Sequence, residues 1–359
     1  MVSLASYALY NAPMHNQLHQ QLAYWYPRRD QHQWVLGCVY KVDGPSYRKP
    51  GAMMFFNDLG EQLGLLSGGC LESDIQKHAS KVMLTQQAVT LCYDGTDEDD
   101  MSVLLGIGCG GTVYIFLQPL TAANNYLNLT TVAEDLNKRK ASILMQKIVV
   151  NNDAPETQHL AQDSEEYLDI LAQIKTHKRY SGSLIELDNQ NWLATHIKPP
   201  TQLLIVGGGV DARPLADIAI TLGWEVSICD PRPANARREH FMSASHILRC
   251  SPQALQNEPL FKHFDAAVVM THNLQLDADA LAALQKSSVN YLALLGPAAR
   301  KQQVLELAGL QPKDLSIPIA GPAGLNLGGE LPEDIALSIL SECLAKLNQA
   351  EAHSISKLL

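Results

Sequence analysis

Two glycine-rich turns that each carry a cysteine are the residues of this sequence best suited to chemistry. They read Ser67-Gly68-Gly69-Cys70 and Gly106-Ile107-Gly108-Cys109-Gly110-Gly111. Glycines let backbone N–H groups approach a ligand closely, and cysteine supplies a soft nucleophile or metal ligand. The two turns therefore predict a site for a phosphorylated, sulfur-linked or metal-linked cofactor.

The first turn precedes an expected helix at 71–83, and a helix N-terminus attracts anions. This position favours a reactive, ligand-binding Cys70, with Glu72 complementing the helix dipole or holding a ligand hydroxyl. The alternative for Cys70 is a small buried side chain that packs well. Cys109 could face Cys70 across a pocket, but their spacing of 39 residues does not match a zinc ribbon.

A third segment, Ser46-Tyr47-Arg48-Lys49-Pro50-Gly51, carries two adjacent basic residues. The planar guanidinium of Arg48 could bind a phosphate through two parallel hydrogen bonds. The alternative is a surface charge on a turn, which is the usual role of a lone Arg-Lys pair.

The second half of the sequence contains a nucleotide-type loop, Gly207-Gly208-Gly209-Val210-Asp211-Ala212. The loop matches the G-x-G-x-x-G/A fingerprint, and Asp230 ends the next expected strand, where an acidic residue can bond a ribose hydroxyl of NAD(P). Alternatively, Gly207 and Gly209 only permit tight packing of a strand against a helix. The carboxylate of Asp211 would lie near the anion site and oppose a tightly held pyrophosphate.

His272 follows another expected strand, at 266–270. In a doubly wound sheet this strand would neighbour the one before the nucleotide-type loop, across the point where the strand order reverses. His272 would then project into the ligand crevice and act as an acid, a base or a hydrogen-bond donor. The alternative is a partly buried histidine that caps a loop.

The expected elements divide the chain into two domains, and the fold class is α/β. Residues 1–199 read as an α+β domain, with helix and connection over 121–180 and an exposed loop at 151–166. Its expected strands lie at 34–42, 52–56, 112–117 (halted by Pro119), 183–187 and 192–197. Lys198-Pro199-Pro200 makes a stiff linker. Residues 200–359 alternate strands and helices and end in an amphipathic helix at 332–347, which predicts a Rossmann-like, doubly wound parallel sheet.

Composition excludes several classes of protein. The net charge of −10 and the pI near 5.6 argue against nucleic-acid binding, because phosphate backbones require a basic surface. No long apolar window predicts a membrane span, and the first residues lack the features of a secretory signal. Seven scattered cysteines fit reduced thiols, so a cytoplasmic protein is expected.

These motifs together resemble the xanthine dehydrogenase accessory factor family, from about Trp34 to Leu347. Gly44-Pro45-Ser46-Tyr47-Arg48-Lys49-Pro50-Gly51-Ala52-Met53, Ser67-Gly68-Gly69-Cys70-Leu71-Glu72 and Gly108-Cys109-Gly110-Gly111 are similar to three family signatures. Cys229-Asp230-Pro231-Arg232, Thr271-His272 and the final helix extend the resemblance. The sequence departs from the family where Gly207-Gly208-Gly209-Val210 replaces the common Gly-Ala-Gly-His, and where Gly296-Pro297-Ala298-Ala299-Arg300 replaces Gly-Ser-Arg-Arg.

The resemblance implies a maturation chaperone rather than a catalyst. Such a protein binds the molybdenum cofactor (molybdopterin), favours its sulfurated form and passes it to a molybdenum hydroxylase apoenzyme. A cofactor-sulfurating protein is a second implied partner, and a homodimer is expected. Arg48 and the turns with Gly68, Gly69 and Gly110 would hold phosphate and pterin, with Cys70 or Cys109 near sulfur or metal.

Two other functions stay open at the level of the sequence. A nicotinamide-dependent oxidoreductase would use Gly207, Gly209, Asp230 and His272, but it leaves the cysteine turns unexplained. The third reading is a structural adaptor that binds a partner protein and no small molecule.

Overall fold

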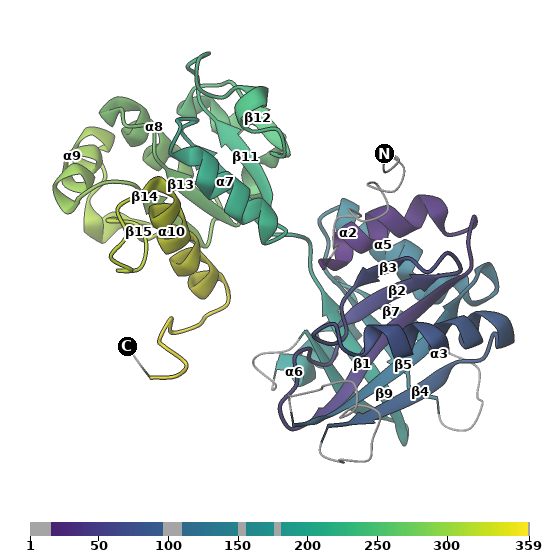
Figure 1. The fold of residues 1–359 in the computed structure, drawn as a ribbon. Coiled ribbons are helices and arrows are strands. Elements are labelled where there is room, and N and C mark those ends of the chain that lie inside the picture. The colour runs from purple at the N-terminus through teal and green to yellow at the C-terminus, as the bar shows by residue number, and fades with distance from the viewer. Residues whose placement is uncertain (1–15, 96–109, 150–155, 176–180, 358–359) are drawn as a thin grey trace, which may run out of the picture. The chain divides into compact units, whose positions relative to one another are not determined.

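The computed structural model describes residues 16–95, 110–149, 156–175 and 181–357. The chain divides into two compact units, Met1–Pro199 and Pro200–Leu359 (Figure 1). Within the described ranges, no helix is long and apolar enough to cross a membrane.

The first unit is built on two antiparallel sheets. The five-stranded sheet has the spatial order β3 (Gln62–Gly64), β2 (Met53–Asn57), β1 (Trp34–Asp43), β5 (Thr112–Leu120) and β4 (Val89–Asp94). The four-stranded sheet has the order β7 (Thr157–Ala161), β6 (Ser142–Lys147), β9 (Gln190–Ile197) and β8 (Gly182–Leu187). The helical elements are α2 (Leu18–Trp25), η1 (Tyr26–Arg28), α3 (Glu72–Thr85), η2 (Ala122–Asn128), α5 (Leu129–Asn137) and α6 (Glu165–Lys175).

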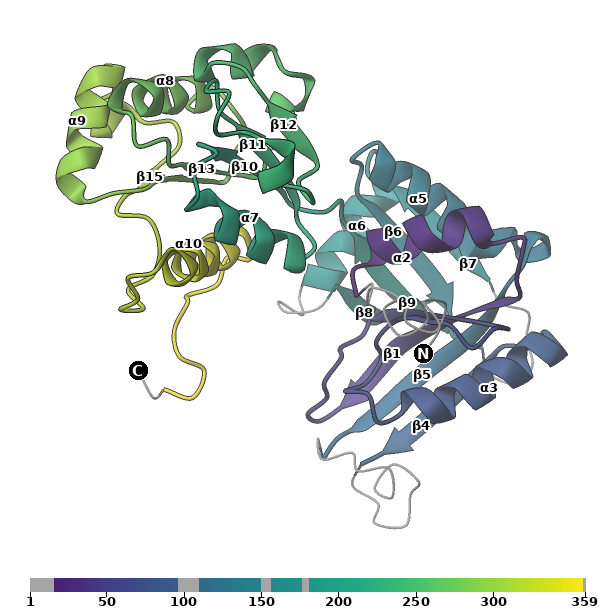
Figure 2. The same ribbon diagram turned by 45° about the horizontal axis from the view of Figure 1, so that its top comes forward.

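Successive side chains of a strand point to opposite faces of its sheet, so the two faces contribute to different hydrophobic clusters. In β1, Val35 and Val39 pack with α3, whereas Leu36 lies in a cluster with Leu144 of β6 and Leu193 of β9. This cluster fills the space between the two sheets and also receives α2 and α5. The other face of the four-stranded sheet packs against α6 (Figure 2). Because α3 covers one face of β1, the loop after β1 and the turn before α3 are held on the same sheet.

Three expectations for the first unit are wrong. Residues 121–180 are not mainly helix and connection, because β6 and β7 lie within them. Strand β6 is buried on both faces and so lacks the alternation that marks a strand, while β7 is a polar edge strand. Of the expected exposed loop at 151–166, residues 151–155 lie outside the described ranges, and the rest contains β7 and the start of α6.

Strand β5 runs through Pro119 rather than stopping before it. Strand β4 begins at Val89, opposite Leu117, and runs away from Pro119. Within the described sheet, Pro119 therefore has a neighbouring strand only on the side of β1, where it is paired with Val35. A proline costs little at such an edge because no ladder hydrogen bond is lost on the open side.

The second unit is a six-stranded parallel sheet with helices on both faces. Its spatial order is β12 (His246–Leu248), β11 (Glu225–Cys229), β10 (Gln202–Val206), β13 (Ala266–Val269), β14 (Tyr291–Leu294) and β15 (Ile319–Ala320). The α-helices are α7 (Ala212–Thr221) and α10 (Pro332–Leu347) on one face, and α8 (Leu274–Leu284) and α9 (Ala298–Ala308) on the other. Short helices η3 (Arg238–His240), η4 (Pro252–Asn257), η5 (Pro259–His263) and η6 (Pro312–Asp314) lie in the connections.

This architecture confirms the predicted fold class. The strand order is that of the dinucleotide-binding fold, with β10 and β13 adjacent where the order reverses. The loops after β10, β11 and β13 therefore meet at one edge of the sheet, as expected for Gly207, Asp230 and His272.

Candidate functional site

The loop after β1, at 44–51, brings together the three signature segments of the first unit. A Cβ on Gly68 would lie 3.8 Å from the ring of Tyr47, so this ring rests against the first cysteine turn. A Cβ on Gly44 would lie 3.4 Å from the Cα of Gly111, the last residue of the second turn. In the second of these contacts the two backbones approach each other closely, which explains why glycine stands on both sides of it.

The same loop is also fixed to the second sheet. Gly51 has a φ of +91°, and a Cβ there would lie 2.8 Å from the backbone nitrogen of Gly182 at the start of β8. Any side chain at either position would force the two backbones apart. The loop is thus held between both sheets of the first unit.

Arg48 lies in this loop as a half-buried cation. In the described part of the chain, its guanidinium makes no hydrogen bond and no ion pair. Burial lowers the pKa of the Arg48 guanidinium, because its charge is partly removed from water. An anionic ligand at this position would supply the missing partner.

Hydrogen bonds within the first cysteine turn hold it in one conformation. The buried carboxylate of Glu72 accepts hydrogen bonds from the Ser67 N–H at 2.8 Å and the Ser67 hydroxyl at 2.5 Å. The Ser67 oxygen in turn accepts the N–H groups of Gly69 and Leu71 at 3.2 and 3.1 Å. Glu72 therefore positions the turn, and its oxygens are already used by the chain itself.

The thiol of Cys70 is partly exposed at the end of this turn. Its Sγ lies 3.8 Å from the Ser67 Oγ. Gly69, with a φ of +104°, has the left-handed backbone that favours glycine, and so does Gly110, with a φ of +66°. Cys109, the other cysteine expected at the site, lies outside the described residues, and no part of the described chain groups three or more His, Cys, Asp or Glu side chains around a potential metal.

In the second unit, Asp230 at the end of β11 binds the glycine loop that follows β10. Its fully buried carboxylate accepts the Gly208 N–H, the Asn235 side-chain amide, and the Arg232 N–H, Nε and Nη2, all at 2.8–2.9 Å. Burial raises the pKa of Asp230, but these hydrogen bonds outweigh it and hold the value at about 2. Asp230 is therefore ionised and fully bonded within the chain.

These hydrogen bonds of Asp230 disfavour the binding of a nicotinamide dinucleotide. A carboxylate offers about four lone-pair positions, and five donors already point at Asp230. A ribose diol could bind Asp230 only by displacing Arg232 or Asn235. The pocket beside the loop, lined by Asp211, Met270 and α10, has a volume of about 50 Å³, far below the roughly 300 Å³ at which ligand sites begin.

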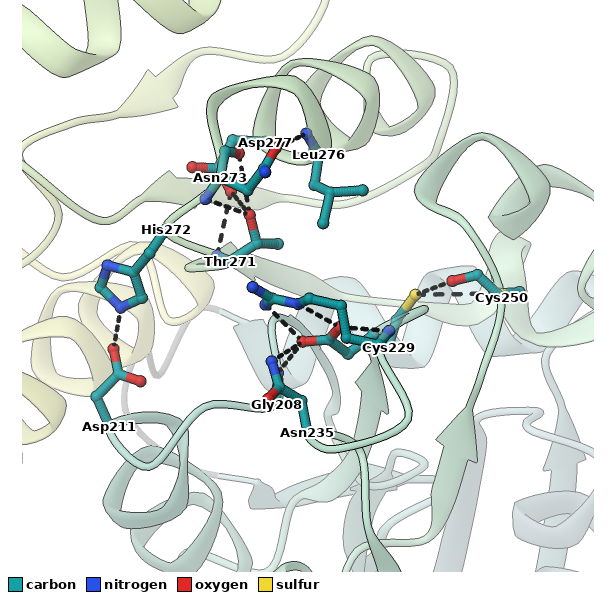
Figure 3. A network of polar contacts seen from close by, with 12 residues as sticks. Gly208, Asp211, Cys229, Asn235, Cys250, Thr271, His272, Asn273, Leu276 and Asp277 are labelled. Atoms are coloured by element: carbon teal, nitrogen blue, oxygen red, sulfur yellow. Dashed lines mark hydrogen bonds and ion pairs between the residues drawn. The ribbon is translucent and has the colours of Figure 1, made fainter.

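His272 pairs with Asp211 at the same edge of the sheet. The two side chains come within 2.6 Å, Nε2 to Oδ2, and His272 is 63% exposed (Figure 3). His272 has a φ of +59°, which is uncommon for a residue with a side chain. A Cβ on Gly209 would lie 2.6 Å from the Asp211 Oδ1, so this carboxylate lies over the loop where a pyrophosphate would approach.

Sequence reasoning missed a second positioning network in this unit. The buried Asp277 accepts the Thr271 N–H at 3.1 Å and the Thr271 hydroxyl at 2.5 Å. Its other oxygen accepts Arg300 Nη2 at 2.6 Å. Arg232 was also overlooked as the partner of Asp230. A useful signal would have been a hydroxyl residue followed five or six positions later by an acid in the first helical turn, as in Ser67 and Glu72.

The predicted site residues thus fall into two groups. The first unit holds Arg48, Gly68, Gly69, Cys70, Glu72 and Gly110 on connected loops. The second unit holds Gly207, Gly209, Asp230 and His272 at the carboxyl edge of its sheet. Of these residues, only Arg48 in the first group is a half-buried charge that the described chain leaves without a partner.

Comparisons with known proteins match both units. Residues 28–94 match the XdhC and CoxI family, and residues 203–343 match the XdhC Rossmann domain. The chain is 32% identical to a Bacillus subtilis protein named as a probable subunit of xanthine dehydrogenase, over 88% of this chain and 93% of that protein. It is 24% identical to the molybdenum cofactor insertion chaperone PaoD of Escherichia coli, over 88% and 85%.

A solved structure shares the whole architecture. The crystal structure described as a xanthine dehydrogenase from Bacillus halodurans superposes with a TM-score of 0.76 at 26% identity, covering 95% of this chain and 99% of that one. The signature loops, the Rossmann unit and these relatives agree. The chain belongs to the XdhC and CoxI family of xanthine dehydrogenase accessory factors.

Proposed function

We propose that this protein binds the molybdenum cofactor in its first unit and assists its sulfuration and insertion into a xanthine dehydrogenase-like molybdenum hydroxylase. The observation that carries this proposal is Arg48, a half-buried cation without an anionic partner in the described chain. The relative named as a molybdenum cofactor insertion chaperone, which aligns with most of this chain, supports it.

The residues around Arg48 suit the chemistry of that cofactor. When bound, the cofactor supplies a phosphate anion, a flat pterin ring and two dithiolene sulfurs that hold molybdenum. Arg48 would hold the phosphate, because a guanidinium binds phosphate oxygens through parallel hydrogen bonds. Tyr47, 63% exposed beside Gly68, offers an aromatic face to the pterin, and the partly exposed Cys70 offers a thiol to the sulfur end.

Other residues of the first unit keep this surface in place. Glu72 and Ser67 act as positioning residues, because their hydrogen bonds set the backbone that carries Cys70. The contact of Gly51 with Gly182 holds the Arg48 loop. No proton transfer or bond cleavage is assigned to the chain, in keeping with a carrier rather than a catalyst.

The alternative of an NAD(P)-dependent oxidoreductase has less support. The hydrogen-bonding positions of the Asp230 carboxylate are already filled by the chain, and the Asp211 carboxylate lies over the glycine loop, so both disfavour a bound dinucleotide. A molybdenum hydroxylase apoenzyme and a cofactor-sulfurating protein are the proposed partners. The homodimer and the cytoplasmic location stay predictions.

The test measures the pterin that copurifies with the protein. We would produce the full chain in a host that makes the molybdenum cofactor and in one that cannot make the pterin, then oxidise the bound pterin and measure its fluorescence. The wild type from the first host should release pterin, and Arg48→Ala should release at least ten-fold less. Lys49→Ala also removes one positive charge from this loop, and this control variant should retain most of the pterin.

Two results would reverse the proposal. One is an absence of pterin in the wild type together with saturable binding of NAD(H). The other is equal retention by Arg48→Ala and wild type. Cys70→Ser is expected to lower retention, and if it does not, the thiol has no part in binding.

A further inference from the structure

Cys229 and Cys250 form a pair of thiols that the proposed function does not use. Their Sγ atoms lie 3.9 Å apart, although the two cysteines are 21 positions apart in the sequence (Figure 3). Cys229 is the last residue of β11. In the parallel pairing of β11 with β12, Cys229 lies opposite Leu248. Cys250 therefore lies two residues past the end of β12, next to the partner strand.

The surroundings of the two sulfurs differ. Cys229 is buried in the core beneath α8 and α9, whereas Cys250 is partly exposed. The hydrogen bond with Cys229 lowers the pKa of Cys250, and the same hydrogen bond together with burial raises the pKa of Cys229. Cys250 is thus the thiol that ionises first and meets reagents from solvent.

The pair is better suited to a disulfide than to a metal. In the described ranges, no third histidine, cysteine, aspartate or glutamate joins the two thiols in a potential metal site. A disulfide needs a sulfur–sulfur distance of about 2.05 Å, so the sulfurs must approach by roughly 1.9 Å, which small side-chain rotations can provide. A cross-link here joins β11 to the short edge strand β12.

We propose that Cys229 and Cys250 are a thiol–disulfide exchange site that closes reversibly into an intramolecular disulfide. The Cys250 thiolate attacks one sulfur of a low-molecular-weight disulfide, such as oxidised glutathione, which forms a mixed disulfide and releases one thiolate. The Cys229 sulfur then attacks Cys250 Sγ, and its proton passes to the second thiolate as this leaves. Two protein thiols are oxidised and one small disulfide is reduced to two thiols.

The position of the bond links it to the glycine loop. Asp230 follows Cys229 directly and donates its N–H to the Leu248 carbonyl at 3.1 Å. The Asp230 side chain in turn holds the Gly208 N–H. Oxidation would therefore fix the strand end from which Asp230 holds the loop, and it should raise the thermal midpoint of the second unit because it closes a loop of the unfolded chain.

The test is a peptide map of the full chain after incubation in glutathione buffers of increasing oxidising strength. Free thiols are alkylated before digestion, so that any other pairing is told apart from this one. We expect a linked 229–250 peptide pair, two hydrogens lighter than the separate peptides, that disappears on treatment with dithiothreitol. Cys92→Ser, a change at an exposed cysteine of β4, should form the same link.

Variants separate this reaction from ordinary surface oxidation. Cys250→Ser should abolish the link and the rise in thermal midpoint, and Cys229→Ser should leave Cys250 as a stable glutathione adduct. The wild-type map does not depend on how well these variants fold. A wild type that keeps the glutathione adduct on Cys250 without forming the link, or that leaves both thiols reduced in the most oxidising buffer, would overturn the proposal.

Discussion

Each unit of this chain contains a turn in which a hydroxyl side chain and a buried carboxylate lock the start of a helix. In the first unit Ser67 donates to Glu72, and in the second Thr271 donates to Asp277, both at 2.5 Å. The two turns differ in their charges. Glu72 takes hydrogen bonds from neutral groups, whereas Asp277 also binds Arg300.

The same difference extends over both candidate sites. At the edge of the Rossmann sheet, three acids each have a basic partner: Asp230 with Arg232, Asp277 with Arg300 and Asp211 with His272. Beside the first cysteine turn, Arg48 has no such partner in the described residues. A site that balances its own charges gains little from an anion, so this difference supports the proposal that the anion binds in the first unit.

The largest effect is expected from Asp277→Ala. It leaves the Arg300 guanidinium, which is only 22% exposed, without its partner and should cost about 3–5 kcal/mol. Calorimetry of the second unit's unfolding transition measures this loss. Because the cost comes from the stranded charge, Asp277→Ala with Arg300→Ala should lose less than the sum of the two single changes, and strict additivity would show that the ion pair is not the cause.

Glu72→Ala should have the next largest effect. It leaves the buried Ser67 N–H and hydroxyl without their acceptor, at a cost of about 2–3 kcal/mol in the first unit. Glu72→Gln keeps an oxygen acceptor and should lose clearly less in the same urea titration. Equal losses for the two variants would mean that the charge of Glu72, and not its hydrogen bonds, holds the turn.

Acid should weaken the second unit through Asp230. Its pKa falls from 3.8 to about 2 on folding, which corresponds to roughly 2 kcal/mol of stability. This contribution is fully present above about pH 4 and is lost as the pH falls through about 2, because protonation then favours the unfolded chain. Unfolding curves measured over this range test it, and Asp230→Asn should remove this part of the slope.

The smallest effect on stability is expected from Arg48→Ala. Since the guanidinium has no partner in the described chain, its loss should change the free energy of unfolding by no more than about 0.5 kcal/mol. Lys49→Ala in the same loop is the matched control. A loss well above 1 kcal/mol for Arg48→Ala would give this residue a structural role and weaken the contrast between the two units.

The second unit could be predicted closely from its sequence. The helix 332–347 and the strands β10 to β14 lie where they were expected, because buried parallel strands form short apolar runs between helical patterns. The two-residue strand β15 was not predicted. In the first unit β3 and β4 were not predicted either, and β6 and β7 were missed inside the expected helical region. One is buried on both faces and the other is a polar edge strand, so neither shows the alternation of a half-buried strand.

The segments of the candidate site could be proposed from the sequence, but their hydrogen-bond partners could not. Residue types and spacing singled out Arg48, the Ser67–Cys70 turn and the Gly207 loop as candidates. The hydrogen bonds of Ser67 to Glu72 and of Arg232 to Asp230 could not be predicted. The type of a residue does not reveal whether its hydrogen bonds go to a ligand or to the chain. Only side-chain geometry separates Arg48, which has no partner among the described residues, from the paired Arg232.

The contact between Gly51 and Gly182 sets an order of events during synthesis. The Arg48 loop is made early, but the strand that holds it, β8, leaves the ribosome much later. Contacts between distant parts of a chain form late because a long loop must close first. A nascent or truncated chain that stops before β8 would therefore carry all the residues of the Arg48 loop and both cysteine turns, yet lack the support that makes them a binding surface.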